Sequence, residues 1–398
     1  MSKSDETYSL DNDLYPLEGY KCIFDVKCNN KGEKILTVRN DLEQKLYYSL
    51  SGEHGLCLDT HYGSVKEGNL VQKLISLPED SPQSLLSYLQ ETGFFFAIPQ
   101  NYEYCVDAVQ LNEIVHRIKA TVLLMSGISE PEHNYEQLIK YVLYLLFEKR
   151  IEICLNERIG YKSCVHDIVK ILSQSSIIPL NDTDYAEANE KGTYSVEDTV
   201  YRKVYEINAE EYSDITTGEK FTFDYPGIDD RRYQVLTSVY KNGTGLGRND
   251  RIVIDFLFHF MNVVGVIKSV SYADGITFYA KPKMEKMDKH LKLGLINVAR
   301  IAISKEINYN IARMKPYYNP KKLEPLWIAP NLITAYYFAL FYMRPGKEIY
   351  RKCVNPSCSG YFSVKTSNAR KKYCDAKCRN ASNQRDHRLR EKRKAHKL

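Results

Sequence analysis

Alternating apolar and polar residues predict β-strands near the start of the chain. Tyr20–Val26 and Lys34–Arg39 are rich in β-branched and aromatic residues, and the polar residues 29–32 between them end in a glycine, which is typical of a turn. Leu46–Leu50 has the same character and is predicted as a third strand. We therefore expect an antiparallel arrangement to begin the fold.

Apolar residues that recur every three or four positions predict helices over the middle of the chain. Ser81-Pro82 is a start signal for a helix over residues 83–93, and residues 138–147 are apolar nearly all round, which predicts a central helix. Longer helical patterns cover Lys289–Arg313 and the apolar segment Asn331–Met343. One further helical face is formed by Leu111, Ile114, Val115, Ile118, Val122 and Met125.

The order of these patterns predicts an α+β body of mixed helices and antiparallel strands. Asn181–Asp198 is acidic and polar and is interpreted as a surface loop or linker. Strand character returns at Tyr201–Ile207, and Asp274-Gly275 predicts a hairpin between residues 266–272 and 276–280. The predicted organisation is an N-terminal lobe (1–175), an acidic linker (176–199), a second lobe (200–345) and a C-terminal zinc finger (346–398).

The distribution of charge separates the end of the chain from the rest. The whole chain of 398 residues has a formal net charge of +5. Residues 351–398 hold 15 Lys+Arg and 3 Asp+Glu, a net of +12, which leaves −7 for residues 1–350. This asymmetry favours a polyanionic partner. No apolar run reaches the roughly 20 residues of a membrane helix, and the N-terminus lacks a signal-peptide pattern, so we expect a cytoplasmic protein without a membrane partner.

Four of the ten cysteines cluster near the C-terminus with the spacing of a metal site. Cys353 and Cys358 form one close pair, and Cys374 and Cys378 form another after fifteen residues. Two such pairs can hold one structural Zn²⁺ tetrahedrally, and a module this small depends on its metal for about 10 kcal/mol of folding energy. The alternatives are an iron–sulfur cluster or four unrelated cysteines. The other six cysteines are interpreted as mostly small buried apolar residues.

The second pair is predicted to lie in a helix, because residues 374–398 contain neither glycine nor proline. Cys374 and Cys378 would then lie on one face of its first turn, where the helix N-terminus favours thiolates. A turn carrying the first pair and a helix carrying the second give a treble-clef-like zinc finger that ends in a basic helix. Its small core is predicted to consist of Tyr361, Phe362, Val364 and Tyr373.

Residues 351–393 resemble the CGNR-type zinc finger, which is found at the C-terminus of bacterial putative transcription regulators. The matching features are Cys353-Val-Asn-Pro-Ser-Cys358, Tyr361-Phe362, the basic run into Tyr373-Cys374, and Cys378-Arg379-Asn380 before a basic helix. The naming motif has Gly before Asn-Arg, whereas Arg379 stands there in this chain. The resemblance implies a DNA-binding transcription regulator, with DNA rather than RNA as the partner.

The basic residues around the second cysteine pair are the predicted nucleic-acid contacts. Some of Arg379, Arg385 and Arg388 are candidates for contacts to bases, and the more distal lysines for contacts to phosphates. The alternative is that the tail contacts a protein surface or folds back onto the acidic body; a nuclear-localisation signal is a weaker interpretation. The candidates are Arg370, Lys371, Lys372, Arg379, Arg385, Arg388, Lys392 and Arg393.

The function predicted from these features is a zinc-finger nucleic-acid-binding protein whose body senses a ligand or mediates oligomerisation. One alternative is an enzyme whose finger is a structural or targeting module; another is a protein-interaction finger. For the enzyme, no catalytic residues are assigned. Gly243–Gly247 lacks the lysine of a phosphate-binding loop, and the Asp59–His61 and Asp229-Asp230 segments have no identifiable partner.

Overall fold

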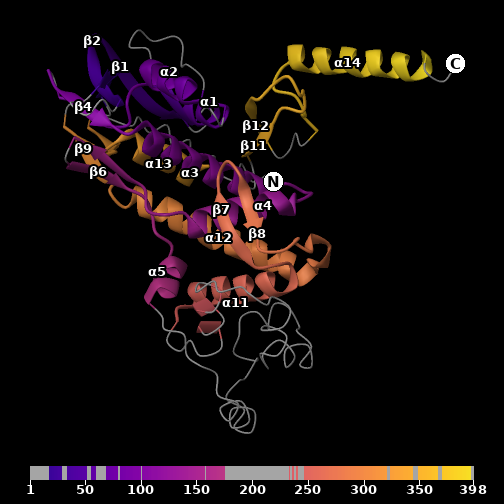
Figure 1. Cartoon of the computed structure of the whole chain (residues 1–398). Coiled ribbons are helices and arrows are strands. Elements are labelled where there is room, and N and C mark those ends of the chain that lie inside the picture. Colours follow the sequence, from indigo (N-terminus) through magenta and orange to yellow (C-terminus); the bar gives the residue numbers. More distant parts are fainter. Residues whose placement is uncertain are drawn as a thin grey trace, which may run out of the picture. The chain divides into compact units, whose positions relative to one another are not determined.

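A computed structural model describes most of the chain, which forms two compact units (Figure 1). The first unit comprises residues 1–130, 150–164 and 306–398, and the second comprises residues 131–149 and 165–305. Both units are thus assembled from segments that are distant in the sequence. The described residues are 18–28, 34–51, 55–59, 69–78, 81–99, 101–156, 158–174, 233, 235–236, 239–240, 246–320, 323–343, 348–365 and 370–395.

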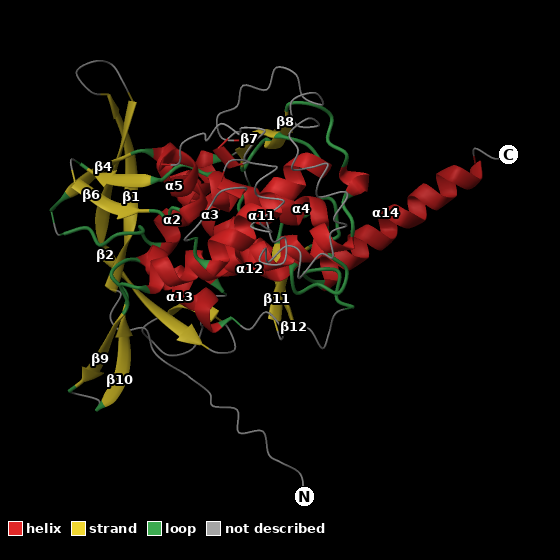
Figure 2. Ribbon diagram, turned by 90° about the horizontal axis from the view of Figure 1, so that it is seen from below, coloured by secondary structure: helices red, strands yellow, loops and turns green. Residues whose placement is uncertain are grey.

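The first unit contains an antiparallel sheet built around one long strand (Figure 2). Strand β2 pairs with each of the other three, with register pairs such as Phe24 with Val38 and Tyr48 with Leu58. Residues 34–39 and 46–50, which the sequence predicted as separate strands, belong to the single strand β2, because β1 continues to pair with it after a register shift at Tyr20. The strands are β1 (Glu18–Cys28), β2 (Lys34–Ser51), β3 (Gly55–Asp59) and β4 (Glu103–Val106).

Helices and two further hairpins complete the body of the first unit. The helix ends follow local capping chemistry: the Ser81 hydroxyl accepts a hydrogen bond from the Ser84 amide, and Asn331 Oδ1 accepts one from the Thr334 amide at 2.8 Å. The helices are α1 (Leu70–Ile75), α2 (Pro82–Thr92), α3 (Ala108–Gly127) and α13 (Leu332–Tyr342). The hairpins are β5 (Glu152–Leu155) with β6 (Arg158–Lys162), and β9 (Lys315–Asn319) with β10 (Glu324–Ile328).

The described part of the second unit is mainly helical. Helix α4 is buried over most of residues 138–146, which confirms the prediction of a central helix over residues 138–147. The predicted hairpin around Asp274-Gly275 is also present. The described elements of the second unit are α4 (Tyr135–Phe147), α5 (Asp167–Gln174), α11 (Arg248–Val263), β7 (Ile267–Ser271), β8 (Gly275–Phe278), the 3-10 helix η2 (Met284–Lys286) and α12 (Lys289–Ile311). The last residues of α12 belong to the first unit.

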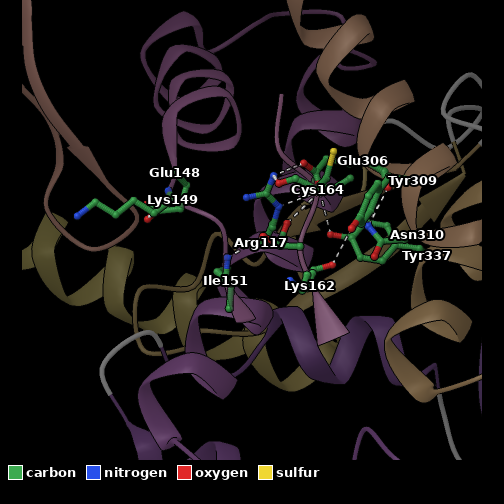
Figure 3. A network of polar contacts seen from close by, with 12 residues as sticks. Arg117, Glu148, Lys149, Ile151, Lys162, Cys164, Glu306, Tyr309, Asn310 and Tyr337 are labelled. Atoms are coloured by element: carbon green, nitrogen blue, oxygen red, sulfur yellow. Dashed lines mark hydrogen bonds and ion pairs between the residues drawn. The ribbon is translucent and has the colours of Figure 1, made fainter. Parts of the chain in front are cut away.

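A buried ion pair lies inside the first unit (Figure 3). The guanidinium of Arg117 on α3 donates to both carboxylate oxygens of Glu306, at 2.9 and 2.5 Å, and to the carbonyl of Cys164 at 2.8 Å. Tyr337 on α13 also donates to Glu306, and both ion-pair side chains are fully buried. The pair therefore joins α3, α13 and the end of α12 through opposite charges that face each other in the core.

Some sequence predictions fall outside the described residues. These are the acidic linker over 176–199, the strand Tyr201–Ile207, and the boundaries predicted near residues 175, 200 and 345. Among the helices that are described, none combines the length and the apolar character needed to cross a bilayer.

Candidate metal centre and basic helix

A short hairpin presents the first cysteine pair. Strands β11 (Glu348–Lys352) and β12 (Tyr361–Lys365) pair antiparallel, and the chain between them contains Cys353 and Cys358. The Cys353 amide donates to the Gly360 carbonyl at 2.9 Å, and the Cys358 amide donates to the Asn355 carbonyl at 2.9 Å. These bonds fold the loop into a tight turn, as predicted for the segment that carries the first pair.

The second pair lies at the start of helix α14 (Ala376–Ala395). Cys378 is in the first turn of the helix, whereas Cys374 precedes it. This corrects the prediction that both cysteines lie on the first helical turn. The reason is the residue between them: Asp375 caps the helix, with Oδ1 accepting from the Cys378 amide at 2.7 Å. That hydrogen bond holds the pKa of Asp375 below its ordinary value.

The four thiol groups converge on one point. All four Sγ atoms lie within 4.8 Å of one another, and Cys358 and Cys374 are 3.9 Å apart. Four sulfurs bound tetrahedrally to Zn²⁺ at about 2.3 Å are roughly 3.8 Å apart, so the observed spacing fits a tetrahedral tetrathiolate site. Cys353 is buried and the other three are partly buried.

The crowding of the thiols affects their protonation. Burial, together with the neighbouring thiols of Cys378, Cys353 and Cys358, raises the pKa of Cys374 well above its ordinary value. Burial disfavours the charged thiolate, and thiolates placed this close also repel one another. A bound divalent cation offsets that repulsion, and thiolate is the form in which cysteine binds a metal. The donor set therefore suits a soft divalent metal ion.

A small apolar core supports the cluster. Ile349, Phe362 and Val364 are buried together with Cys353, and Tyr373 packs against them with the other three cysteines. The prediction of Phe362 and Val364 as core residues is confirmed, while Tyr361 is only partly buried and Ile349 takes the remaining place. In β12 the core residues Phe362 and Val364 are two positions apart, as expected for one face of a strand.

The cysteines outside the cluster do not form disulfides among the described residues. Cys22, Cys57 and Cys164 are buried, as predicted, whereas Cys105 and Cys154 are exposed. The Cys22 thiol donates to the Leu89 carbonyl at 3.1 Å, and burial raises the pKa of that thiol to about 12. These thiols are therefore separate from the four-cysteine cluster, and Cys22 acts as a small buried residue.

The hairpin is attached to helices α1 and α3 within the first unit. The Tyr350 amide donates to Ser126 Oγ at 2.9 Å, and the Tyr361 amide donates to Ser76 Oγ at 2.9 Å. Asn69 Nδ2 also donates to the Tyr350 hydroxyl oxygen at 2.6 Å. These contacts connect the finger to the body by ordered hydrogen bonds in addition to the covalent chain, and no sequence motif predicts them.

The predicted nucleic-acid contacts fall into two groups. Arg370, Lys371 and Lys372 precede the second cysteine pair, and all three are exposed. The ammonium of Lys371 also lies 5.1 Å from the centre of the Phe362 ring, so this residue packs onto the finger core. The second group lies on α14, where Arg379, Arg385 and Arg388 are exposed; the side chains of Lys392 and Arg393 are outside the described part of that helix.

A pocket in the second unit bears on the enzyme alternative. It has a volume of about 210 Å³ and is lined by apolar side chains that include Phe147 and Met261. The charged residues in its described lining are Glu148 and Lys149, and Glu148 Oε1 accepts from the Lys149 amide. The described lining of this pocket therefore assigns no catalytic residues to the enzyme alternative. Residues 243–245, His61 and Asp229-Asp230 lie outside the described residues.

Comparisons with known proteins add no family to this description. No family model, no curated protein and no solved structure matches the chain. The resemblance to the CGNR-type finger stays an expectation drawn from the residues of the finger alone. Function must therefore be argued from the geometry of the cysteine cluster and of α14.

Proposed function

We propose that this protein binds nucleic acid, with duplex DNA as the preferred form, through α14 held by a zinc finger of the treble-clef type. The observation that carries the proposal is the exposed basic helix that starts at the cysteine cluster. Helix α14 has 20 residues, with eight Lys and Arg against two acids. Such a helix, anchored at one end, suits a polyanion whose phosphates are spaced along a groove.

The composition of α14 argues against a protein partner. A helix that docks in a protein groove presents apolar anchors at spacings of three, four and seven residues. In α14 the one large aliphatic residue is Leu389, and the other apolar residues are alanines and Cys378. With no apolar stripe to bury, an electrostatic partner fits α14 better.

The exposure of α14 also argues against an interaction with the acidic body. Arg379, Arg385, Arg388 and Arg390 are all exposed in the structure. Salt bridges to the carboxylates of the same chain would bury part of these guanidinium groups. Their charge is therefore available to an external ligand.

Zinc is the ion that best fits the donor set. Four cysteine thiolates around one ion are typical of closed structural sites, which carry no open coordination position for catalysis. Binding of Zn²⁺ by four thiolates leaves the cluster with a charge of −2, which lowers but does not cancel the positive charge of the finger. In this proposal the metal orders the finger and fixes the direction of α14. The body would act as a sensing or oligomerisation module of a transcription regulator.

The test is binding of the full-length zinc-loaded protein to fluorescein-labelled duplex DNA over a range of salt concentrations. The wild type should bind with an affinity that falls linearly on a log–log plot against salt. The triple variant Arg385→Gln, Arg388→Gln and Arg390→Gln should bind at least about tenfold more weakly. Its salt slope should be shallower by about 0.9 for each phosphate that the variant no longer neutralises.

A matched control variant removes three positive charges from positions outside the finger. Lys286, Arg313 and Lys315 are exposed and lie outside the finger, so their replacement by Gln changes the net charge equally. Equal weakening of binding in both triple variants would show a general charge effect and would contradict a binding site on α14. Absence of duplex binding by the wild type would contradict the proposed function itself.

A further inference from the structure

One face of α14 is directed toward the cysteine cluster and the small core around it. Ser382 is buried, and its Oγ accepts a hydrogen bond from the Tyr373 hydroxyl at 3.3 Å. Cys378, one helical turn earlier, is partly buried against the finger core. Residues four apart lie on the same side of a helix, so these two side chains define the inner face of α14.

The outer face over the same turns is formed by uncharged hydrogen-bonding side chains. Asn380 and Gln384 are each two positions from Ser382, which places them roughly 200° round the helix. Asn383 and His387 complete the set, because positions 380, 383, 384 and 387 have the spacing of one helical face. All four are exposed, and none makes a side-chain hydrogen bond within the described part of the chain.

Helix stability does not explain this outer face. Asparagine is among the poorer helix formers, and an exposed helical position that makes no contacts is better filled by Ala, Glu or Lys. Asn380 and Asn383 therefore lower the stability of α14 without a compensating side-chain hydrogen bond among the described residues. Cations flank them: Lys377 precedes the outer face and Arg388 follows it. In such an arrangement the amides can form hydrogen bonds with base edges, and the flanking cations can contact phosphates.

We propose that Asn380, Asn383 and Gln384 read base edges in the major groove of duplex DNA, with a preference for sites containing adenine. This inference rests on the proposed function and identifies the ligand of the same helix. The amide of Asn or Gln carries a donor and an acceptor side by side, which matches N6 and N7 of adenine. His387 extends the outer face by one turn toward the flanking base pairs.

The form of α14 favours duplex DNA over RNA. A continuous helix of 20 residues is about 30 Å long, and the major groove of B-DNA admits a helix, whereas that of A-form RNA is too narrow. Single-stranded nucleic acid is bound largely by stacking on aromatic side chains. Helix α14 contains no Phe, Tyr or Trp. The outer face thus fits the major groove of a duplex.

The experiment selects preferred duplexes from a random-sequence pool with the zinc-loaded full-length protein. It then compares the enriched duplex with a scrambled one for the wild type and for Asn383→Ala/Gln384→Ala. The wild type should enrich sites with adenine. The variant should show about tenfold to a hundredfold less discrimination between the two duplexes. Its affinity for scrambled DNA and its salt slope should stay unchanged, because alanine keeps the helix and no cation is removed.

A second variant distinguishes recognition of bases from electrostatic attraction to phosphates. Arg388→Gln should weaken binding to both duplexes alike and reduce the salt slope by about 0.9, with discrimination kept. The inference is overturned if the pool yields no enriched sequence, if the amide variant discriminates like the wild type, or if single-stranded RNA binds more tightly than the duplex. In the first two cases salt-dependent DNA binding would persist and the proposed function would stand. If the wild type binds no nucleic acid, both fail together.

Discussion

Arg351 in strand β11 forms a bidentate ion pair with Glu130, which lies just beyond the end of helix α3. The guanidinium Nε donates to Glu130 Oε1 at 2.7 Å, and Nη2 donates to Oε2. Arg351 Nη1 also donates to the Lys371 carbonyl at 3.1 Å, so one side chain connects the body with the segment that precedes the second cysteine pair. The finger is therefore attached to the body close to its cysteine cluster.

This ion pair should make a measurable but modest contribution to stability. Both side chains are partly exposed, at 19% and 23%, so solvent screening reduces the gain that the bidentate geometry gives. We expect Glu130→Gln to lower the free energy of unfolding by about 1 kcal/mol in urea titrations. A double-mutant cycle with Arg351→Met should give a coupling energy of similar size. A coupling energy of zero would mean that the ion pair adds nothing to the attachment of the finger.

The buried Arg117–Glu306 pair should behave differently. Both side chains are fully buried, so removal of one charge leaves the other without compensation in the core. Glu306→Gln should lower the free energy of unfolding by about 3–5 kcal/mol. The double variant Arg117→Met/Glu306→Met should be less destabilised than Glu306→Gln, since it leaves no lone buried charge. Equal destabilisation of the single and double variants would contradict the claim that a lone buried charge causes the loss of stability in Glu306→Gln.

The parts of the fold that the sequence predicts are those with strong local signals. The helical pattern over Asn331–Met343 corresponds to α13 over Leu332–Tyr342, because an Asn cap precedes a fully apolar segment. The spacing of the cysteines predicts their cluster, because a metal site restricts ligands more strictly than packing restricts a core. The start of the second pair's helix lies two residues later than predicted, because a capping Asp375 inside the motif starts the helix after Cys374.

Contacts between distant segments are not predictable from local pattern. Arg117 and Glu306 are 189 residues apart, and each resembles an ordinary surface charge within its own helix. Arg351 and Glu130 are 221 residues apart. Their pairing depends on which helices pack together, which a single sequence does not specify. The outer face of α14 is an intermediate case, since its spacing is in the sequence but only the burial of Ser382 shows which side faces out.

A buried histidine should make the second unit sensitive to acid. His259 on α11 is fully buried, and this burial lowers its pKa to about 3 from the ordinary 6.5. Its Nε2 lies 3.1 Å from the Tyr240 hydroxyl, and the Phe258 ring packs edge-on beside it. Between pH 6.5 and about 3 the unfolded chain binds a proton at this residue that the native protein does not. The contribution of neutral His259 to the free energy of unfolding is therefore fully present above pH 6.5 and is lost as the pH falls through that window.

The histidine contribution can be separated from general acid unfolding. Over the window, the free energy of unfolding should fall by about 1.4 kcal/mol per pH unit from this one group. His259→Gln should remove that slope, so the urea midpoints of variant and wild type should converge as the pH is lowered from 7 to 4. His387→Gln, at an exposed position on α14, is the matched control for the substitution, and wild-type midpoints serve as the reference at each pH. Parallel curves for the wild type and His259→Gln would show that His259 does not titrate on unfolding.

Metal removal should affect both the order of the finger and the binding of DNA, because α14 begins at the cluster. Cys374→Ser removes one of four converging thiols, whereas Cys105→Ser changes an exposed thiol outside the cluster. Metal analysis should find one zinc per chain in the wild type and in Cys105→Ser, and little in Cys374→Ser. Hydrogen exchange should show reduced protection in β11, β12 and the first turns of α14 of Cys374→Ser, because a metal-dependent module this small does not fold without its ion.

The same two variants then connect the metal to the proposed function. If zinc fixes the direction of α14, Cys374→Ser should lose discrimination between the selected and scrambled duplexes while keeping part of its salt-dependent affinity, since its cations remain. Cys105→Ser should retain both. Iron in place of zinc in the wild type would overturn the assignment of the ion. Full discrimination by metal-free Cys374→Ser would show that α14 reads DNA without being oriented by the cluster, and the metal would then serve the attachment of the hairpin to α1 and α3 alone.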